Sequence, residues 1–124
     1  IWYHDGLVFF TTKGDNKVWE LDTVTDSLRV IYSPQTADIP HLTGVDNVTV
    51  SPGGQVLVAE DGGDMQLVAL EYPDRARPLL QIENQDSSEI TGPAFDPSGT
   101  RLYFSSQRGT NGNGITYEVT GPFC

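Results

Sequence analysis

Cysteine is almost absent from this sequence, because the single Cys124 is the last residue. One thiol cannot form an internal disulfide, and one thiolate is too few to build a zinc site. Apolar runs are also short, and none approaches the roughly 20 residues that a membrane-spanning helix requires. We therefore expect a soluble chain that does not span a membrane. The low cysteine content fits a cytosolic protein and an exported bacterial protein equally well.

Basic residues are scarce as well. The chain has 7 lysines and arginines against 17 acidic residues, which gives a formal net charge of -10. A charge of this sign repels phosphate backbones and anionic membranes, so nucleic acid is not an expected partner. No charged and then apolar leader precedes Ile1, and the first residues resemble the approach to a strand. We expect that Ile1 is not the natural N-terminus.

The sequence shows no sustained helical periodicity. It contains instead short runs rich in β-branched and aromatic residues, separated by turn sequences such as KGDN, SPGG and DGGD. This pattern is typical of antiparallel strands joined by tight turns. We predict ten strands, at 7–12, 17–22, 28–32, 45–50, 55–60, 65–72, 78–83, in the run that opens at 91, and at 101–106 and 114–119.

The strands fall into three related sets. Gly99 in DPSGTRLYF follows Gly54 in SPGGQVLVA by 45 residues, and Gly6 in HDGLVFF precedes Gly54 by 48. A repeat of about 40 to 50 residues with four short strands is typical of β-propeller blades. The predicted fold is all-β, with antiparallel four-stranded blades. Residues 1–124 would form one β-propeller fragment of about two and a half blades.

The expected boundaries are a partial blade at 1–40, a complete blade at 41–85 and a partial blade at 86–124. The first blade would enter at its second strand, and the last would stop at its third. A ring cannot close with so few blades. Exposed blade edges are templates for association, so we expect self-association or a companion fragment. Gly53 or Gly54 should have a positive φ, and Trp2, Tyr3 and Trp19 should pack between blades.

Several segments together resemble a known family. The run GVDNVTVSPGGQVLVAEDGG, the later EITGPAFDPSGTRLYFSSQRG and the terminal GITYEVTGPF are similar to the C-terminal region of PhoX-type bacterial alkaline phosphatases. This resemblance implies an exported, metal-dependent phosphomonoesterase, found in the periplasm, at the cell surface or outside the cell. It also implies calcium, and iron, in a central tunnel that holds a phosphate ester substrate. The isolated fragment would be inactive.

The resemblance also suggests metal ligands. Inner strands of a propeller begin at the mouth of the central channel, which would bring Asp46, Asn47 and Glu89 close to the axis. Carboxylate and amide oxygens are the ligands that calcium prefers, and metal ions stabilise the charge that develops on a phosphoryl group. Glu60 and Asp61 are further candidates at the end of the next strand. No residue is assigned a catalytic role.

Simpler interpretations remain open for the same residues. An Asp-Asn pair before a strand commonly caps a turn through side-chain hydrogen bonds. Residues 60–63 read as a hairpin turn with solvated acids, and Glu89 as an exposed side chain. Two alternative functions also remain, namely a lactonase-like metal-dependent hydrolase on a propeller and a non-catalytic binding or assembly module. Tight calcium uptake would count against the non-catalytic module.

Overall fold

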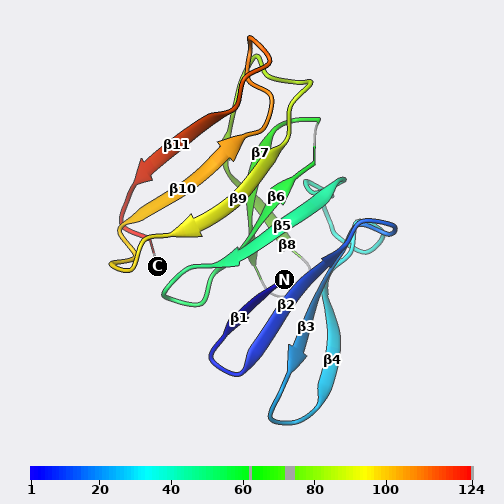
Figure 1. Cartoon of the computed structure of the whole chain (residues 1–124). Helices are drawn as coiled ribbons and strands as arrows, with labels where there is room; N and C mark the ends of the chain where they lie inside the picture. The colour runs from blue at the N-terminus through cyan, green and yellow to red at the C-terminus, as the bar shows by residue number, and fades with distance from the viewer. Residues whose placement is uncertain (62, 72–74, 124) are drawn as a thin grey trace.

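The computed structural model describes residues 1–61, 63–71 and 75–123, and every regular element within them is a β-strand. The strands form three antiparallel sheets, which follow one another along the chain and in space (Figure 1). Sheet 1 contains β1 (Trp2–His4), β2 (Leu7–Thr12), β3 (Lys17–Asp22) and β4 (Ser27–Tyr32). Sheet 2 contains β5 (Val45–Val50), β6 (Val56–Glu60), β7 (Gln66–Glu71) and β8 (Arg75–Gln81). Sheet 3 contains β9 (Ile90–Phe95), β10 (Arg101–Ser106) and β11 (Ile115–Thr120).

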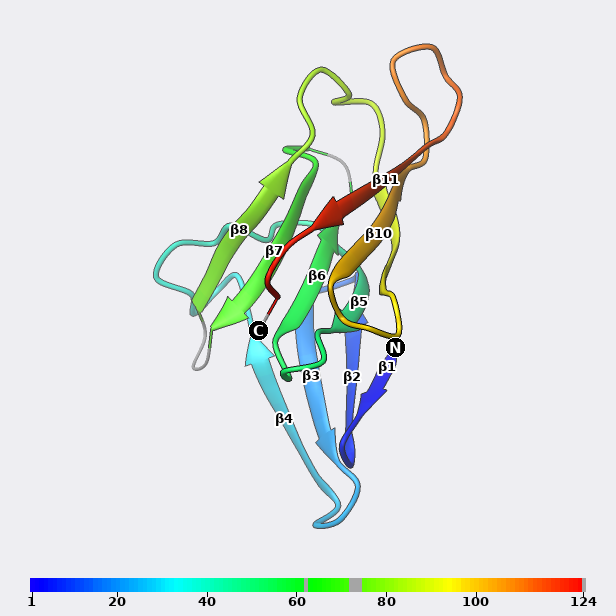
Figure 2. The ribbon, with the colours of Figure 1, turned by 90° about the vertical axis from the view of Figure 1, so that its left-hand side faces the viewer.

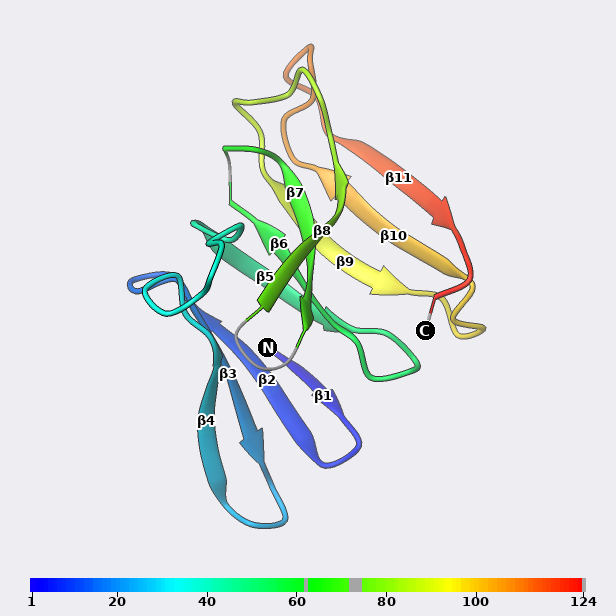
Figure 3. The same cartoon turned by 180° about the vertical axis from the view of Figure 1, so that it is seen from behind.

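Within each sheet, strands that are consecutive in the chain are neighbours. The first strands of the sheets lie close together, since β5 contacts β1 and β2 on one side and β9 on the other. The last strands, β4, β8 and β11, form the opposite edges of their sheets (Figures 2 and 3). The prediction of an all-β chain with small antiparallel sheets is therefore confirmed.

One strand was not predicted. The described residues contain eleven strands instead of ten, and the additional one is the three-residue β1, which pairs with β2. Asp5 and Gly6 connect the two strands with φ values of 46° and 84°. Two central residues with positive φ are characteristic of the tight hairpin turn that Asp-Gly favours. The expectation that the first sheet lacks its innermost strand is thus wrong, because β1 occupies this position.

Two hydrophobic cores hold the sheets together. Sheet 1 packs on sheet 2 through buried residues that include Phe9, Val18 and Val58, and the second core joins sheet 2 to sheet 3 around Leu67 and Leu102. Sheet 2 is therefore apolar on both faces. Strand β6 is buried along its whole length for the same reason. This double burial explains why β6 reads as a continuous apolar run instead of an alternating one.

Equivalent turns in sheets 2 and 3 differ in length by one residue. In sheet 2, Val50 lies opposite Val56 across the turn, whereas in sheet 3 Phe95 lies opposite Leu102. Both turns place a glycine at positive φ, with 91° at Gly54 and 71° at Gly99, which confirms the prediction for Gly53 or Gly54. The extra residue of sheet 3 follows the glycine. Leu102 consequently takes the structural place of Val56.

The aromatic residues near the N-terminus do not all pack between the sheets. Tyr3 is 65% exposed and lies opposite Val8 on β2. Trp19 lies opposite Phe10, on the face of sheet 1 that points away from sheet 2. Tyr3 and Trp19 therefore do not contribute to a core between two of the described sheets, and their packing between blades stays a prediction. Within the described ranges, no helix has the length and apolar character to cross a membrane.

Candidate functional site

Three carboxylates from two sheets converge at one end of the molecule. Asp46 is in β5, Asp61 directly follows β6 and Glu89 directly precedes β9. One oxygen from each residue lies within 4.8 Å of the others. We call these three residues the acidic triad. Such a spacing is short enough for all three oxygens to contact one cation.

Backbone hydrogen bonds fix two members of the triad. The amide of Asp61 donates to the carbonyl of Gly44 at 2.6 Å, which anchors the end of β6 beside the start of β5. The carbonyl of Glu89 accepts from the amide of Gln107 at 3.0 Å, just beyond the end of β10. The strand ends therefore determine where these carboxylates lie. The start of β5 and the approach to β9 thus bring Asp46 and Glu89 close to one another, while their position beside a propeller axis stays a prediction.

Two basic side chains contact the triad. Lys13, in the turn after β2, places its Nζ 2.6 Å from Asp61 Oδ2 and 3.4 Å from Asp46 Oδ2. Arg108, which follows β10, lies 3.2 Å from Glu89 Oε1. Both basic side chains are about half exposed, so each can leave its carboxylate at small energetic cost. The site as a whole combines three acids with two bases.

The electrostatics within the triad follow from these contacts. The hydrogen bond with Glu89, followed by the one with Lys13, holds the pKa of Asp61 below its usual range. The hydrogen bond with Asp61 raises the pKa of Glu89, and burial adds to the effect. The hydrogen bond to Asp61 also raises the pKa of Lys13. Between these two acids, Asp61 therefore ionises before Glu89.

Asn47 does not present its oxygen to the triad. Its Oδ1 accepts hydrogen bonds from the Gly92 amide at 2.7 Å and from Thr91 Oγ1 at 3.1 Å, both in β9. Its Nδ2 donates to Asp46 Oδ1 at 3.2 Å. Asn47 thus joins β5 to β9 and orients Asp46. The role that these contacts give Asn47 is structural, and its role as a ligand stays a prediction.

Glu60 and Asp61 diverge although they are adjacent. Glu60 is only 3% exposed, and its Oε1 accepts from the amide and hydroxyl of Thr43 at 3.4 and 3.3 Å. Its Oε2 has no hydrogen-bond partner among the described atoms. Burial raises the pKa of Glu60. The interpretation of Glu60 as a solvated turn acid is therefore wrong, while Gly62, in the same predicted turn, lies outside the described residues.

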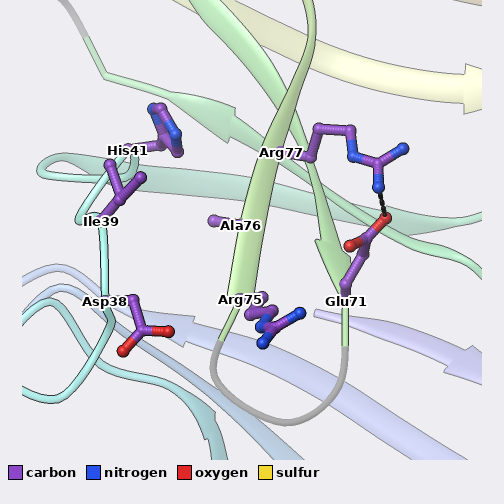
Figure 4. A pocket seen from close by; sticks show the side chains of 7 residues that line it. All are labelled: Asp38, Ile39, His41, Glu71, Arg75, Ala76 and Arg77. Atoms are coloured by element: carbon purple, nitrogen blue, oxygen red, sulfur yellow. Dashed lines mark ion pairs between the residues drawn. The ribbon is translucent and has the colours of Figure 1, made fainter.

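A separate pocket of about 300 Å³ lies between the segment after β4 and the start of β8 (Figure 4). Its charged residues are Asp38, Glu71, Arg75 and Arg77, and His41 also lines it. Arg77 forms an ion pair with Glu71 at 2.6 Å. Because two acids balance two arginines, the pocket has no strong preference for an anion or a cation. Its charge gives no basis for assigning it a ligand.

Comparisons with protein-family models, with curated proteins and with solved structures found no match for this chain. The fold and the site geometry are therefore the basis for the function proposed below.

Sequence reasoning did not find the two basic partners of the triad. Lys13 is 33 residues from Asp46, and its KGDN context resembles an ordinary turn. The signal that could have located it is the repeat itself. Lys13, Asp61 and the segment with Arg108 all follow the second strand of their sheets, so these segments meet at the same end of the molecule.

Proposed function

We propose that this chain is part of a β-propeller and that it contributes carboxylate ligands to a divalent cation site at the inner ends of its sheets. The observation that carries the proposal is the convergence of Asp46, Asp61 and Glu89 from two successive sheets. The sequential strand order and the proximity of β1, β5 and β9 support the propeller architecture. Hard cations such as calcium favour a set of carboxylate oxygens of this kind.

The reaction class that we propose for the parent enzyme is phosphomonoester hydrolysis. A bound metal would supply Lewis acidity toward a phosphoryl oxygen. Lys13 and Arg108 are suited to hold further phosphate oxygens, because lysine and arginine form charge-assisted hydrogen bonds with phosphate. The site thus offers carboxylates for the metal ion and, beside them, basic groups for the phosphate oxygens of the substrate. Calcium, iron and export from the cell belong to the same proposal through the resemblance described above.

Calcium titration of the 124-residue chain tests the ligand assignment. We expect binding by isothermal titration calorimetry with a dissociation constant on the order of 10⁻⁴ to 10⁻³ M, since three side chains supply only part of a full coordination shell. Asp46→Asn and Glu89→Gln should each weaken binding at least about tenfold, because each removes one charged ligand. Asp86→Asn is the matched control, because Asp86 is exposed and lies outside the triad.

Equal affinities of the three variants and the original chain would refute the assignment of the triad as a cation site. The activity needs a second assay, in a longer chain that combines this segment with further blades. We expect calcium-dependent hydrolysis of p-nitrophenyl phosphate that Asp46→Asn abolishes. Hydrolysis of a lactone without phosphatase activity would instead favour the lactonase-like alternative. Calcium binding without either activity would favour a binding module.

A further inference from the structure

Sheet 1 is apolar on the face that points away from sheet 2. The register pairs Tyr3 with Val8, Val8 with Leu21, and Leu21 with Leu28, and residues directly opposite one another lie on the same face. Phe10, Trp19 and Val30 extend this row by the same pairing rule. We call this surface the outer face of sheet 1, formed by Tyr3, Val8, Phe10, Trp19, Leu21, Leu28 and Val30.

The outer face is exposed in the described chain. Leu28 is 55% exposed, Val30 39% and Tyr3 65%. Sheet 1 meets sheet 2 on the opposite side, where β1 and β2 lie close to β5 and buried side chains such as Phe9 and Val18 pack against sheet 2. Figure 1 shows no described element beyond sheet 1 on its outer side. A contiguous apolar patch of this kind on a soluble protein marks an interaction surface.

The outer face is also preorganised. Phe10 and Trp19 stack with their ring centroids 6.1 Å apart, and Trp19 Nε1 donates to Thr12 Oγ1 at 2.9 Å. The Lys17 ammonium lies 5.9 Å from the centre of the Trp19 ring. The largest side chain of the face is therefore held in place before any partner arrives, which lowers the entropic cost of association.

The repeat indicates what this face accommodates. In sheet 2 the equivalent face contains Val56 and Val58 and is covered by sheet 1. In sheet 3 it contains Leu102 and Phe104 and is covered by sheet 2. In each case the covering layer is an apolar face of another sheet. The outer face of sheet 1 has the same chemistry and is therefore suited to an apolar β-sheet.

The opposite end of the molecule cannot supply such a layer. Tyr103 and Glu118 are paired on the outer face of sheet 3 and are joined by a 2.5 Å hydrogen bond. Ser105 and Thr116 are joined there in the same way at 2.9 Å. This surface is polar, so a head-to-tail stack of copies would bury hydroxyl and carboxylate groups against aromatic rings, at a cost in desolvation.

We propose that a second copy of this chain covers the outer face of sheet 1, with the same face of each copy in contact across a two-fold axis. The face suits this pairing because none of its residues is acidic, although the chain carries a net charge of -10. The strands of sheet 1 define a surface of roughly 400 Å² per copy, from about 4.8 Å between strands and about 3.3 Å per residue. A total near 800 Å² is small for a stable interface, so the expected dimer is weak and reversible.

This contact is isologous, and it therefore closes at two copies and does not propagate. It differs from the edge pairing expected from the sequence, because it buries side chains of a sheet face and leaves the strand edges free. It does not depend on the cation site, since none of the triad residues belongs to the face. In a longer propeller the preceding blade would occupy the same surface.

Sedimentation velocity from micromolar to submillimolar concentration tests the proposal. We expect a monomer that converts to a dimer and to nothing larger, with dimerisation strengthened by sodium chloride, which screens the repulsion between two acidic copies. Leu28→Lys and Val30→Lys should each weaken dimerisation at least about tenfold, because both place a charge within an apolar contact. Both positions are already more than one third exposed, so the variants should keep the fold.

Thr116→Lys is the matched control, since it adds the same charge to the polar outer face of sheet 3, where Thr116 is exposed. It should leave the dimerisation constant unchanged. A monomer at all concentrations would overturn the proposal. So would a dimer that Leu28→Lys and Val30→Lys do not affect while circular dichroism shows them folded. Growth beyond the dimer would indicate edge pairing or head-to-tail stacking instead.

Discussion

Glu60 is a buried carboxyl group beside the exposed end of its own strand. Its Oε1 is held by Thr43, and its Oε2 has no partner among the described atoms. An ionised carboxylate in this position loses its hydration without full compensation. The folded protein therefore favours the protonated form of Glu60. The stability of the domain should depend on pH through this residue.

We predict that Glu60→Gln stabilises the protein at pH 7 by about 1 to 3 kcal/mol, because burial penalises the charged carboxylate more than the neutral amide that replaces it. Because the folded pKa is raised, the stabilising contribution of Glu60 is full below its unfolded pKa and is lost as the pH rises through the folded pKa. The gain from Glu60→Gln should thus be small near pH 4 and grow toward neutrality. Urea unfolding at several pH values measures this difference in the free energy of unfolding between the variant and the original protein.

The exposed Glu83 provides the control for this prediction, since Glu83→Gln removes the same charge from a solvated position. Its effect on the free energy of unfolding should stay within about 0.5 kcal/mol at every pH. If Glu60→Gln gave the same small effect near neutrality, the burial of an ionised Glu60 would not be costly.

Asn47 connects two sheets through one side-chain oxygen. We predict that Asn47→Ala lowers the free energy of unfolding by about 1 kcal/mol, because the Gly92 amide loses its acceptor. Thr91→Val removes only the second of the two hydrogen bonds to this oxygen and should cost less. Chemical denaturation compares them in calcium-free buffer. A larger loss for Thr91→Val would contradict the role of Asn47 as the acceptor for the Gly92 amide.

At the scale of the elements, two equivalent turns touch each other. Gly54 and Gly99 both have positive φ, but their surroundings differ. A Cβ on Gly54 would meet only His4 Nε2 at 3.8 Å, whereas a Cβ on Gly99 would clash with the ring of Pro52. The turn of sheet 3 is therefore packed directly against the turn of sheet 2.

We predict that Gly54→Ala costs about 1 to 2 kcal/mol, the penalty of a left-handed backbone for a residue with a Cβ. Gly99→Ala should cost about 1 to 3 kcal/mol more, because it adds an overlap with Pro52. Gly14→Ala is the control, since its φ is not in the left-handed region and no atom lies within 4 Å of the added carbon. Thermal unfolding should show the smallest loss of stability for Gly14→Ala, a larger loss for Gly54→Ala and the largest for Gly99→Ala. Equal losses for Gly54→Ala and Gly99→Ala would exclude the contact between the turns.

The sequence predicts most of the strands because their turn signals are strong. The three-residue strand β1 escaped prediction because it is too short to show alternation, although the Asp5-Gly6 pair after it is a hairpin signal. Strand alternation predicts that Glu60 and Asp61 point in opposite directions, but it cannot tell which of them faces Asp46. That choice depends on the register between β5 and β6 and on their packing against sheet 3. The approach of Lys13 is likewise set by tertiary structure.

At the scale of the whole molecule, the excess of acids opposes folding. A net charge of -10 on 124 residues leaves most carboxylates without a basic partner, because only 7 lysines and arginines are present. Repulsion among like charges destabilises a compact state and is screened by salt. The stability of this protein should therefore respond to ionic strength more than that of a neutral domain.

We predict that the midpoint of thermal unfolding at pH 7 rises by several degrees between low salt and about 0.5 M sodium chloride, a change on the order of 1 kcal/mol. Near pH 4.3, the isoelectric point of the sequence, the same salt series should leave the midpoint nearly unchanged. Differential scanning fluorimetry provides both series. A midpoint that falls with salt at pH 7 would mean that ion pairs such as that between Lys13 and Asp61 outweigh the general repulsion.

The additional residue in the turn between β9 and β10 leaves the pairing of its two strands unchanged. Five residues separate the partners Val50 and Val56 in sheet 2, and six separate the partners Phe95 and Leu102 in sheet 3. Because the shorter turn already joins an equivalent pair, removal of Thr100 should keep Phe95 opposite Leu102 and leave the alternation of β10 in phase. Related sequences are therefore expected to gain or lose one residue at this turn without any shift in the apolar pattern of the strand that follows.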